Sequence, residues 1–316
     1  MTGTTSDSPR RALVLGGGGI AGIAWHLGVL AELQSQGIDV GAADLVVGTS
    51  AGSVAGAILR FGHVDAVYDA QATSAAPFGA ADAAAAGIAP EGAGVSPDSA
   101  AAPAPALDMA TFGQRLAEVV AGATGPEDAR ARLGRASIAF SQGVESPLLA
   151  QVGAQFPEAA GWPSAPLGVC VVNAENGEFR VIDSSDGIPL ARAVAASCSV
   201  PLVFPTVEID GVHYIDGGAR SATNADVAAG YDRVLVLSCG AEDARSPMGP
   251  QLDAAVAGLR DDADSPSAVL VVSADAASLQ AFGGNSLDDA SRVPSALAGR
   301  AQGASVAESV RAFWQA

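Results

Sequence analysis

The sequence feature that most constrains the fold is a serine between two glycines, directly after a short apolar run. Leu45 to Val47 is apolar, and Gly48-Thr-Ser-Ala-Gly52 follows with Ser50 at its centre. The pattern G-x-S-x-G between a strand and a helix is that of a nucleophile elbow, a sharp turn that exposes the serine hydroxyl. Glycines are needed on both sides because backbone passes close to backbone. We therefore expect an α/β fold with Ser50 at the end of a buried strand.

A second glycine-rich turn precedes this one. Arg11 to Leu15 is predicted to be a buried strand, residues 16–19 are all glycine, and Ile20 to Gln36 is predicted to be a helix. Backbone N–H groups in such a loop face a cavity without side-chain obstruction, and the helix N-terminus adds positive potential. The loop is therefore a candidate oxyanion site for a reaction at Ser50.

The stretch from Gly17 to Gly22 also matches the dinucleotide pattern G-x-G-x-x-G. A dinucleotide fold requires an acidic residue at the end of its second strand, roughly 20 residues further on. The next predicted strand, Leu45 to Val47, leads instead into Gly48, and Asp44 precedes it. The sequence therefore favours the oxyanion interpretation over dinucleotide binding.

The histidines do not supply a base for Ser50 in the usual order. An α/β-hydrolase triad runs serine, acid, histidine along the chain. The sequence contains His26, His63 and His213, and no histidine follows residue 213. His213 lies three positions before Asp216 on a predicted strand, so the two side chains should point to opposite faces of the sheet.

The remaining candidate base is a carboxylate. Asp216 ends the predicted strand 212–215 and precedes Gly217 and Gly218. Sites in open α/β sheets assemble at the ends of strands. A plain Asp-Gly-Gly turn is the alternative interpretation.

The order of elements predicts a three-layer α/β/α architecture with a mostly parallel central sheet, because strands alternate with helices. Further strands are predicted at 167–173, 178–182, 201–207, 233–238 and 268–272, and two C-terminal helices at 287–298 and 304–314. We expect residues 1–10 to be disordered and residues 11–316 to form one domain. An Ala/Gly/Pro-rich insertion at about 73–106 would be a surface linker or a cover over the site.

The net charge of −18 argues against nucleic acid as a partner and against electrostatic recruitment to anionic membranes. The uncharged stretch from Ala12 to Ala31 could suggest a signal or a membrane span, but its glycines favour a strand, a loop and a helix. No carboxylate cluster or cysteine spacing indicates a metal site. We therefore expect no metal and no cofactor, and a cytoplasmic location.

Three motifs in this order resemble the patatin-like phospholipases. They are the segment 15–22 (Leu-Gly-Gly-Gly-Gly-Ile-Ala-Gly), the segment 48–52 (Gly-Thr-Ser-Ala-Gly) and the segment 216–218 (Asp-Gly-Gly). The stretch 195–205, which leads to the aspartate, is also similar to what that family carries. The resemblance covers about residues 11–225, and it implies a patatin-like fold and a Ser–Asp dyad without histidine.

The resemblance also implies roles for individual residues. Ser50 would be the nucleophile and Asp216 the base that takes its proton. The oxyanion hole would consist of Gly17, Gly18 and Gly19. The other motif glycines are Gly22, Gly48, Gly52, Gly217 and Gly218. The family often has Arg or Lys at the position of Ala21, so preference for anionic head groups would be weaker here.

We therefore expect a serine-dependent hydrolase of acyl esters of phospholipids or related lipids, with possible transient contact to a membrane surface. The first alternative is an esterase or thioesterase for smaller soluble acyl substrates. The second is a non-catalytic binding protein that retains the fold.

Overall fold

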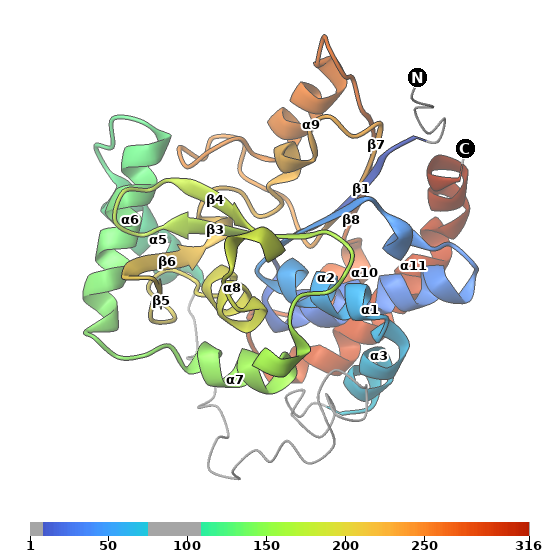
Figure 1. Ribbon diagram of the computed structural model, residues 1–316, viewed down its shortest axis with the longest axis horizontal. Helices are drawn as coiled ribbons and strands as arrows, with labels where there is room; N and C mark the ends of the chain where they lie inside the picture. The colour runs from blue at the N-terminus through green and yellow to red at the C-terminus, as the bar shows by residue number, and fades with distance from the viewer. Residues whose placement is uncertain (1–8, 75–108, 316) are drawn as a thin grey trace.

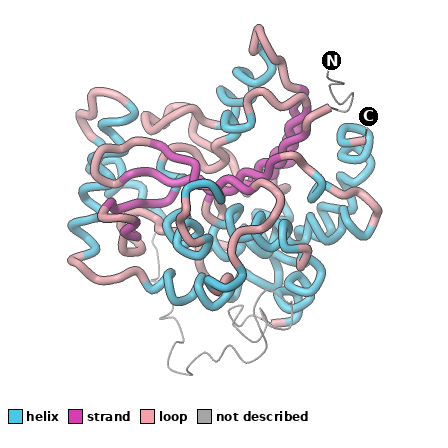
Figure 2. The backbone as a smooth tube through the Cα atoms, viewed as in Figure 1, coloured by secondary structure: helices cyan, strands magenta, loops and turns pink. Residues whose placement is uncertain are grey.

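The computed structural model describes residues 9–74 and 109–315, which form helices on both sides of a mixed sheet (Figures 1 and 2). The strands are β1 (Arg11–Leu15), β2 (Leu45–Thr49), β3 (Leu167–Asn173), β4 (Phe179–Ile182), β5 (Val207–Ile209), β6 (Val212–Asp216), β7 (Arg233–Ser238) and β8 (Ala268–Ser273). The helices are α1 (Gly19–Ser35), α2 (Ala51–Phe61), α3 (Val64–Thr73), α5 (Met109–Val120), α6 (Pro126–Ser141), α7 (Pro147–Gln155), α8 (Leu190–Ser197), α9 (Leu252–Asp261), α10 (Ala276–Phe282) and α11 (Arg292–Trp314).

The sheet has eight strands in the order β5-β6-β3-β2-β1-β7-β8, and β4 also pairs with β3. The strands β3, β2, β1, β7 and β8 are mutually parallel, whereas β4, β5 and β6 join by antiparallel pairing. The expected α/β class with a mostly parallel central sheet is confirmed.

Strand β1 lies in the middle of the sheet and is buried on both faces. Its side chains alternate, so Leu13 and Leu15 join the core formed with α1 and α2. Ala12 and Val14 belong to the core on the other face, which includes Leu259 of α9. Figure 1 shows α9 on the side of the sheet opposite to α1, α2 and α11. This burial on both faces explains why β1 is continuously apolar after its first residue.

Two strands meet end to end along one edge of β3. β2 runs parallel to β3 with Thr49 opposite Cys170, and β6 runs antiparallel with Asp216 opposite Val171. β4 pairs with the same stretch of β3 and therefore occupies its other edge. The carboxyl ends of β2 and β6 thus point toward each other at consecutive positions of β3. Ser50 follows β2 directly, so it meets Asp216 at this point.

Two predicted elements are wrong. Residues 201–207 were expected to form a strand, but the chain turns there, with Leu202 at a φ of 62°, and β5 begins only at Val207. The two expected C-terminal helices are one helix, α11. Gly299 and Gly303 do not end it, because they allow close contact with α1. A Cβ at Gly299 would lie 2.3 Å from the carbonyl oxygen of Trp25.

Most of the expected disordered segment 1–10 and of the Ala/Gly/Pro-rich insertion 73–106 lies outside the described residues. At their borders, the N–H of Arg10 donates to Asp232, and α3 extends to Thr73.

Candidate active site

Ser50 lies in a strained turn between β2 and α2. Its φ is 51° and its ψ is −117°, a conformation that residues with a side chain rarely adopt. The flanking glycines make the turn possible. A Cβ at Gly52 would lie 1.9 Å from the carbonyl oxygen of Leu15, and one at Gly48 would lie 2.5 Å from the Cα of Ser53. The expected elbow geometry is therefore present, with each glycine explained by a close backbone approach.

Asp216 ends β6 and is only 4% exposed. Its Oδ1 accepts a hydrogen bond of 2.7 Å from the N–H of Gly218. Burial raises the pKa of the Asp216 carboxyl from 3.8 to about 7. Hydrogen bonds from the Ser50 side chain and from the Gly218 N–H act in the opposite direction and lower this pKa, but their effect is smaller. The buried Asp216 carboxyl thus lies beside the Ser50 side chain.

The glycine loop lies beside Ser50, but its N–H groups are not equivalent. The N–H of Gly16 donates to Leu237 at 3.0 Å, and the N–H of Gly17 donates to Ala222 at 2.8 Å. The expectation that Gly17 supplies an oxyanion donor is therefore not met in this geometry, because a carbonyl already takes that hydrogen. Gly18 and Gly19 have no N–H partner among the described residues, since α1 begins there and its first N–H groups lack intrahelical acceptors.

Close packing explains why the loop contains only glycine at these positions. A Cβ at Gly18 would lie 2.6 Å from Cys239 Sγ, and one at Gly19 would lie 2.7 Å from the carbonyl oxygen of Ser286. Gly19 also has a φ of 64°. Gly22 donates its N–H to the carbonyl of Gly18 and closes the first turn of α1.

A cavity of about 380 Å³ opens over these groups. Ser50, Asp216 and the glycines 17–19 lie on its wall, which is otherwise mostly apolar. The apolar wall includes Phe112, Leu116, Leu133, Val200, Val203 and Leu287. A serine, a carboxylate and free backbone donors therefore face a space suited to an apolar substrate.

The family model described as patatin-like phospholipase matches residues 13–229. The chain belongs to the patatin-like phospholipase family. Membership supports lipid acyl hydrolase activity at the level of the family.

No curated protein matches the sequence of this patatin-like chain. Among solved structures it is similar to VipD from Legionella pneumophila, at 14% identity and a TM-score of 0.42, over 96% of this chain and 68% of VipD. It is also similar to the type III effector protein ExoU, at 15% identity and a TM-score of 0.42, over 96% of this chain and 54% of ExoU.

Ser197 of α8 links the backbone of the Ser50 turn to strand β3 in this patatin-like site. Its Oγ accepts a 2.9 Å hydrogen bond from the N–H of Ser50 and donates a 2.8 Å bond to the carbonyl of Cys170. Ser197 is fully buried. Its role was not predicted from the sequence, although Ser197 lies in the stretch 195–205 that resembles the family.

Asn224 links the two halves of the site and was also missed. Its buried side-chain amide donates to Thr49 Oγ1 at 3.1 Å and to the carbonyl of Gly217 at 3.1 Å. Thr49 precedes the serine and Gly217 follows the aspartate, so one side chain holds both turns. The sequence feature that could have indicated this role is the segment Ser-Ala-Thr-Asn at 221–224, which lies shortly after the Asp-Gly-Gly motif.

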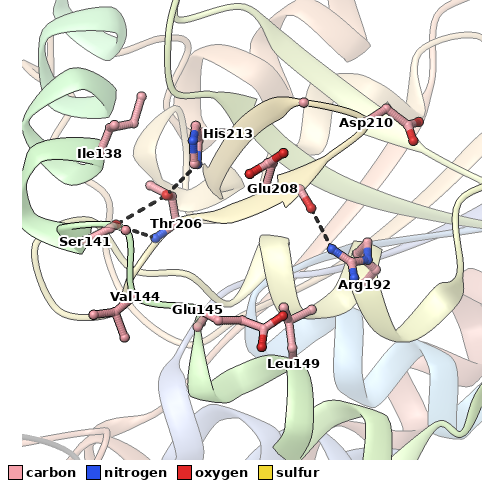
Figure 3. A pocket seen from close by; sticks show the side chains of 13 residues that line it. Ile138, Ser141, Val144, Glu145, Leu149, Arg192, Thr206, Glu208, Asp210 and His213 are labelled. Atoms are coloured by element: carbon pink, nitrogen blue, oxygen red, sulfur yellow. Dashed lines mark hydrogen bonds between the residues drawn. The ribbon is translucent and has the colours of Figure 1, made fainter.

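The histidines lie away from the candidate dyad, as the sequence predicted for His213. Its Nδ1 is 3.0 Å from Thr206 Oγ1 in a separate hollow of about 700 Å³ (Figure 3), whereas Asp216 lines the Ser50 cavity. His26 is buried beneath the glycine loop, with Nε2 2.8 Å from the carbonyl of Gly16. Burial lowers the pKa of His26 to about 4. His63 immediately precedes α3.

Within residues 9–74 and 109–315, no group of three or more His, Cys, Asp or Glu side chains is placed to hold a metal ion. In the same ranges, no helix has both the length and the apolar character needed to cross a membrane.

Proposed function

We propose that the protein is a serine-dependent hydrolase that cleaves acyl ester bonds of lipids, with Ser50 as nucleophile and Asp216 as base. The observation that carries this proposal is the pairing of a strained, glycine-flanked serine with a buried carboxyl whose pKa is about 7. Family membership and the apolar cavity favour a lipid substrate over a small soluble ester.

In the acylation step, Ser50 Oγ attacks the ester carbonyl while Asp216 accepts its proton. The N–H groups of Gly18 and Gly19 hydrogen-bond to the developing oxyanion, and the N-terminus of α1 adds positive potential. Collapse of the intermediate breaks the bond to the alcohol oxygen. The proton on Asp216 then passes to that oxygen, so the alcohol leaves neutral and an acyl-Ser50 ester remains.

In the deacylation step, ionised Asp216 takes a proton from water as the water oxygen attacks the acyl-enzyme. The same N–H groups hold the second oxyanion. The fatty acid is released, and the proton returns from Asp216 to Ser50 Oγ. An aspartate with an ordinary pKa would be a weak base for both steps, whereas a pKa near the working pH suits general base catalysis.

Several finer expectations remain predictions. They are a single domain over residues 11–316, a cytoplasmic location, transient contact with a membrane surface, and the Ser–Asp dyad itself. An esterase or thioesterase acting on smaller acyl groups is the alternative within the same chemistry.

Labelling with a fluorophosphonate probe tests the proposed nucleophile. The wild-type protein should be labelled and Ser50→Ala should not. Ser305→Ala is a matched control, because Ser305 lies on the exposed side of α11 and its hydroxyl donates only to the carbonyl of Gln302. Equal labelling of Ser50→Ala, or none of the wild type, would remove the hydrolase proposal.

The substrate class requires a second comparison. Activity on phospholipid vesicles should be measured beside activity on short monomeric esters, with Ser50→Ala as the blank. Higher turnover at the lipid surface supports a lipid substrate. Equal or higher turnover of the monomeric esters would assign the site to the alternative esterase function.

A further inference from the structure

Two spaces meet at Ser50. One is the cavity of about 380 Å³, called the wide cavity below, and the other is a narrow arm of about 110 Å³ between α1, α2 and α7. Four residues line both spaces, namely Gly19, Ser50, Val200 and Leu287. An ester held at Ser50 has two limbs, its acyl chain and its alcohol, so each space can receive one of them.

The position of Asp216 decides which limb lies in which space. Asp216 and Gly218 line the wide cavity, and neither lines the narrow arm. In the proposed acylation step, Asp216 returns a proton to the alcohol oxygen, which must then lie within about 2.6–3.2 Å of the carboxyl. The carbonyl oxygen lies at the N–H groups of Gly18 and Gly19. The alcohol therefore occupies the wide cavity, and the acyl chain is left to the narrow arm.

The shapes of the two spaces agree with this assignment. The narrow arm has mainly apolar walls and shares Ile23 and Val54 with a pocket of about 30 Å³ that reaches Ile58 of α2. Arg292 and Gln71 line that end, each is 3% exposed, and a 3.2 Å hydrogen bond joins them. Such a slot fits an unbranched acyl chain and limits its length. The wide cavity has room for a branched alcohol.

The wide cavity offers no positive charge to the alcohol. Asp216 is the only acidic or basic side chain among the described residues on its wall, and the whole sequence contains no lysine. In a phospholipid the phosphate is only a few bonds from the alcohol oxygen, so it would lie close to Asp216. A buried phosphate would lack a counter-charge there, and it would raise the pKa of the carboxyl that must ionise for catalysis.

We propose that the narrow arm holds the scissile acyl chain and that the wide cavity holds an uncharged, apolar alcohol, so that neutral acylglycerols are preferred to phospholipids. Hydrolysis of a diacylglycerol by the two steps given above consumes one water and releases a fatty acid and a monoacylglycerol. This inference rests on the proposed function for the roles of Ser50 and Asp216. The charge preference can also be tested without turnover.

Lipids that differ only at the third glycerol carbon test the charge of the alcohol. Turnover of dioleoylglycerol and of dioleoyl phosphatidic acid is compared at equal mole fraction in micelles of a neutral detergent. We expect kcat/KM to be at least about tenfold higher for dioleoylglycerol, because only the phosphate places a second anion near Asp216. An equal or higher value for the phosphatidic acid overturns the proposal.

A cation added to the wall of the wide cavity should remove this preference. Leu116→Arg, at a half-buried position of α5, should bring the two kcat/KM values close to each other. Leu116→Gln adds polarity without charge and should keep the wild-type preference. Val144→Arg is the control for net charge, because Val144 is 63% exposed and lines the separate hollow of Figure 3. An unchanged preference in Leu116→Arg contradicts the charge argument.

Two wall substitutions test which limb lies in which space. Ile23→Phe narrows the arm, so kcat/KM for methylumbelliferyl esters should fall more steeply as the acyl chain lengthens from butyrate to decanoate. Its ranking of different alcohols on one acyl chain should stay as in wild type. Val203→Phe narrows the wide cavity and should change the ranking of alcohols without changing the dependence on acyl length. The opposite pattern in the two variants overturns the assignment.

Binding to the inactive Ser50→Ala variant separates this inference from the proposed function. At pH 8, calorimetry should give dioctanoylglycerol at least about tenfold tighter binding than dioctanoyl phosphatidic acid, even if the wild type hydrolyses no lipid. Equal binding, or tighter binding of the phosphatidic acid, overturns the inference and leaves the hydrolase proposal intact. Absence of fluorophosphonate labelling in the wild type, by contrast, removes the hydrolase proposal and does not alter the binding comparison.

Discussion

Replacing Asp216 with asparagine should strongly lower turnover and, above neutral pH, make the protein more stable. The buried carboxyl has a pKa of about 7 in the folded protein against 3.8 as an ordinary aspartate. At about 1.4 kcal/mol for each pH unit between those values, ionising Asp216 in the folded state lowers the free energy of unfolding by about 4 kcal/mol.

The sign of the effect follows from which state binds the proton. Below pH 3.8, Asp216 is protonated in both the folded and the unfolded state, so it contributes no penalty. Between pH 3.8 and 7 the unfolded state loses the proton first, and stability falls as the pH rises. Above pH 7 the penalty is complete. Asparagine is neutral at every pH, and its side-chain oxygen can still accept from the N–H of Gly218.

Urea unfolding of wild type and Asp216→Asn at pH 4 and pH 8 measures this difference. The variant should gain up to about 4 kcal/mol relative to wild type at pH 8 and little at pH 4. Asp253→Asn, which changes an exposed carboxylate of α9, is the control and should show no such dependence. A difference between Asp216→Asn and wild type that does not change with pH would refute the argument. Turnover should fall by about 10²–10⁴-fold, the usual contribution of a general base.

Three further predictions concern the same site. The kcat/KM of the wild type should fall as the pH drops through about 7, because Asp216 must be ionised to accept the proton, and a flat profile from pH 5 to 9 would contradict this. Gly19→Ala should lower kcat by about 10²–10³-fold by displacing an oxyanion donor. Gly62→Ala, which has a similar positive φ but open space around it, should only destabilise, as thermal unfolding and kcat together would reveal. Ser197→Ala should cost about 1–3 kcal/mol of stability and reduce kcat, because the N–H of Ser50 loses its acceptor, and unchanged values of both would exclude a positioning role.

Much of the fold could be predicted because strongly patterned segments form the secondary structure that their local sequence favours. The run Arg11–Leu15 and the Gly-x-Ser-x-Gly turn place β1, β2 and α2 with almost their observed bounds. The residues alone offered Asp216 as a candidate base for Ser50 beside the alternative of a plain turn, and the family resemblance specified the pairing. It depends on β2 and β6 meeting on one edge of β3, which no local pattern encodes.

The errors have a common physical origin, since tertiary contacts override local preference. Two helices were expected at 287–298 and 304–314, but α11 is continuous, and Gly299 and Gly303 within it let that helix pack closely on α1. The oxyanion role expected for Gly17 fails because Ala222, some 200 residues away in sequence, supplies an acceptor for its N–H. Asn224 could be recognised as a link between the two turns only once Thr49 and Gly217 were seen together.

In the proposed mechanism, the burial of Asp216 would allow Ser50 to be activated without histidine. Asp216 has one strong backbone donor, from Gly218, and a hydrogen bond with Ser50, and burial outweighs both in setting its pKa. The basicity of the carboxylate therefore comes from exclusion of water. In the proposed mechanism, the apolar wall that would hold a lipid chain would also limit water around Asp216, so substrate binding and the basicity of Asp216 would depend on one set of side chains. Polar substitutions in that wall, for example at Leu133 or Val200, would weaken both together.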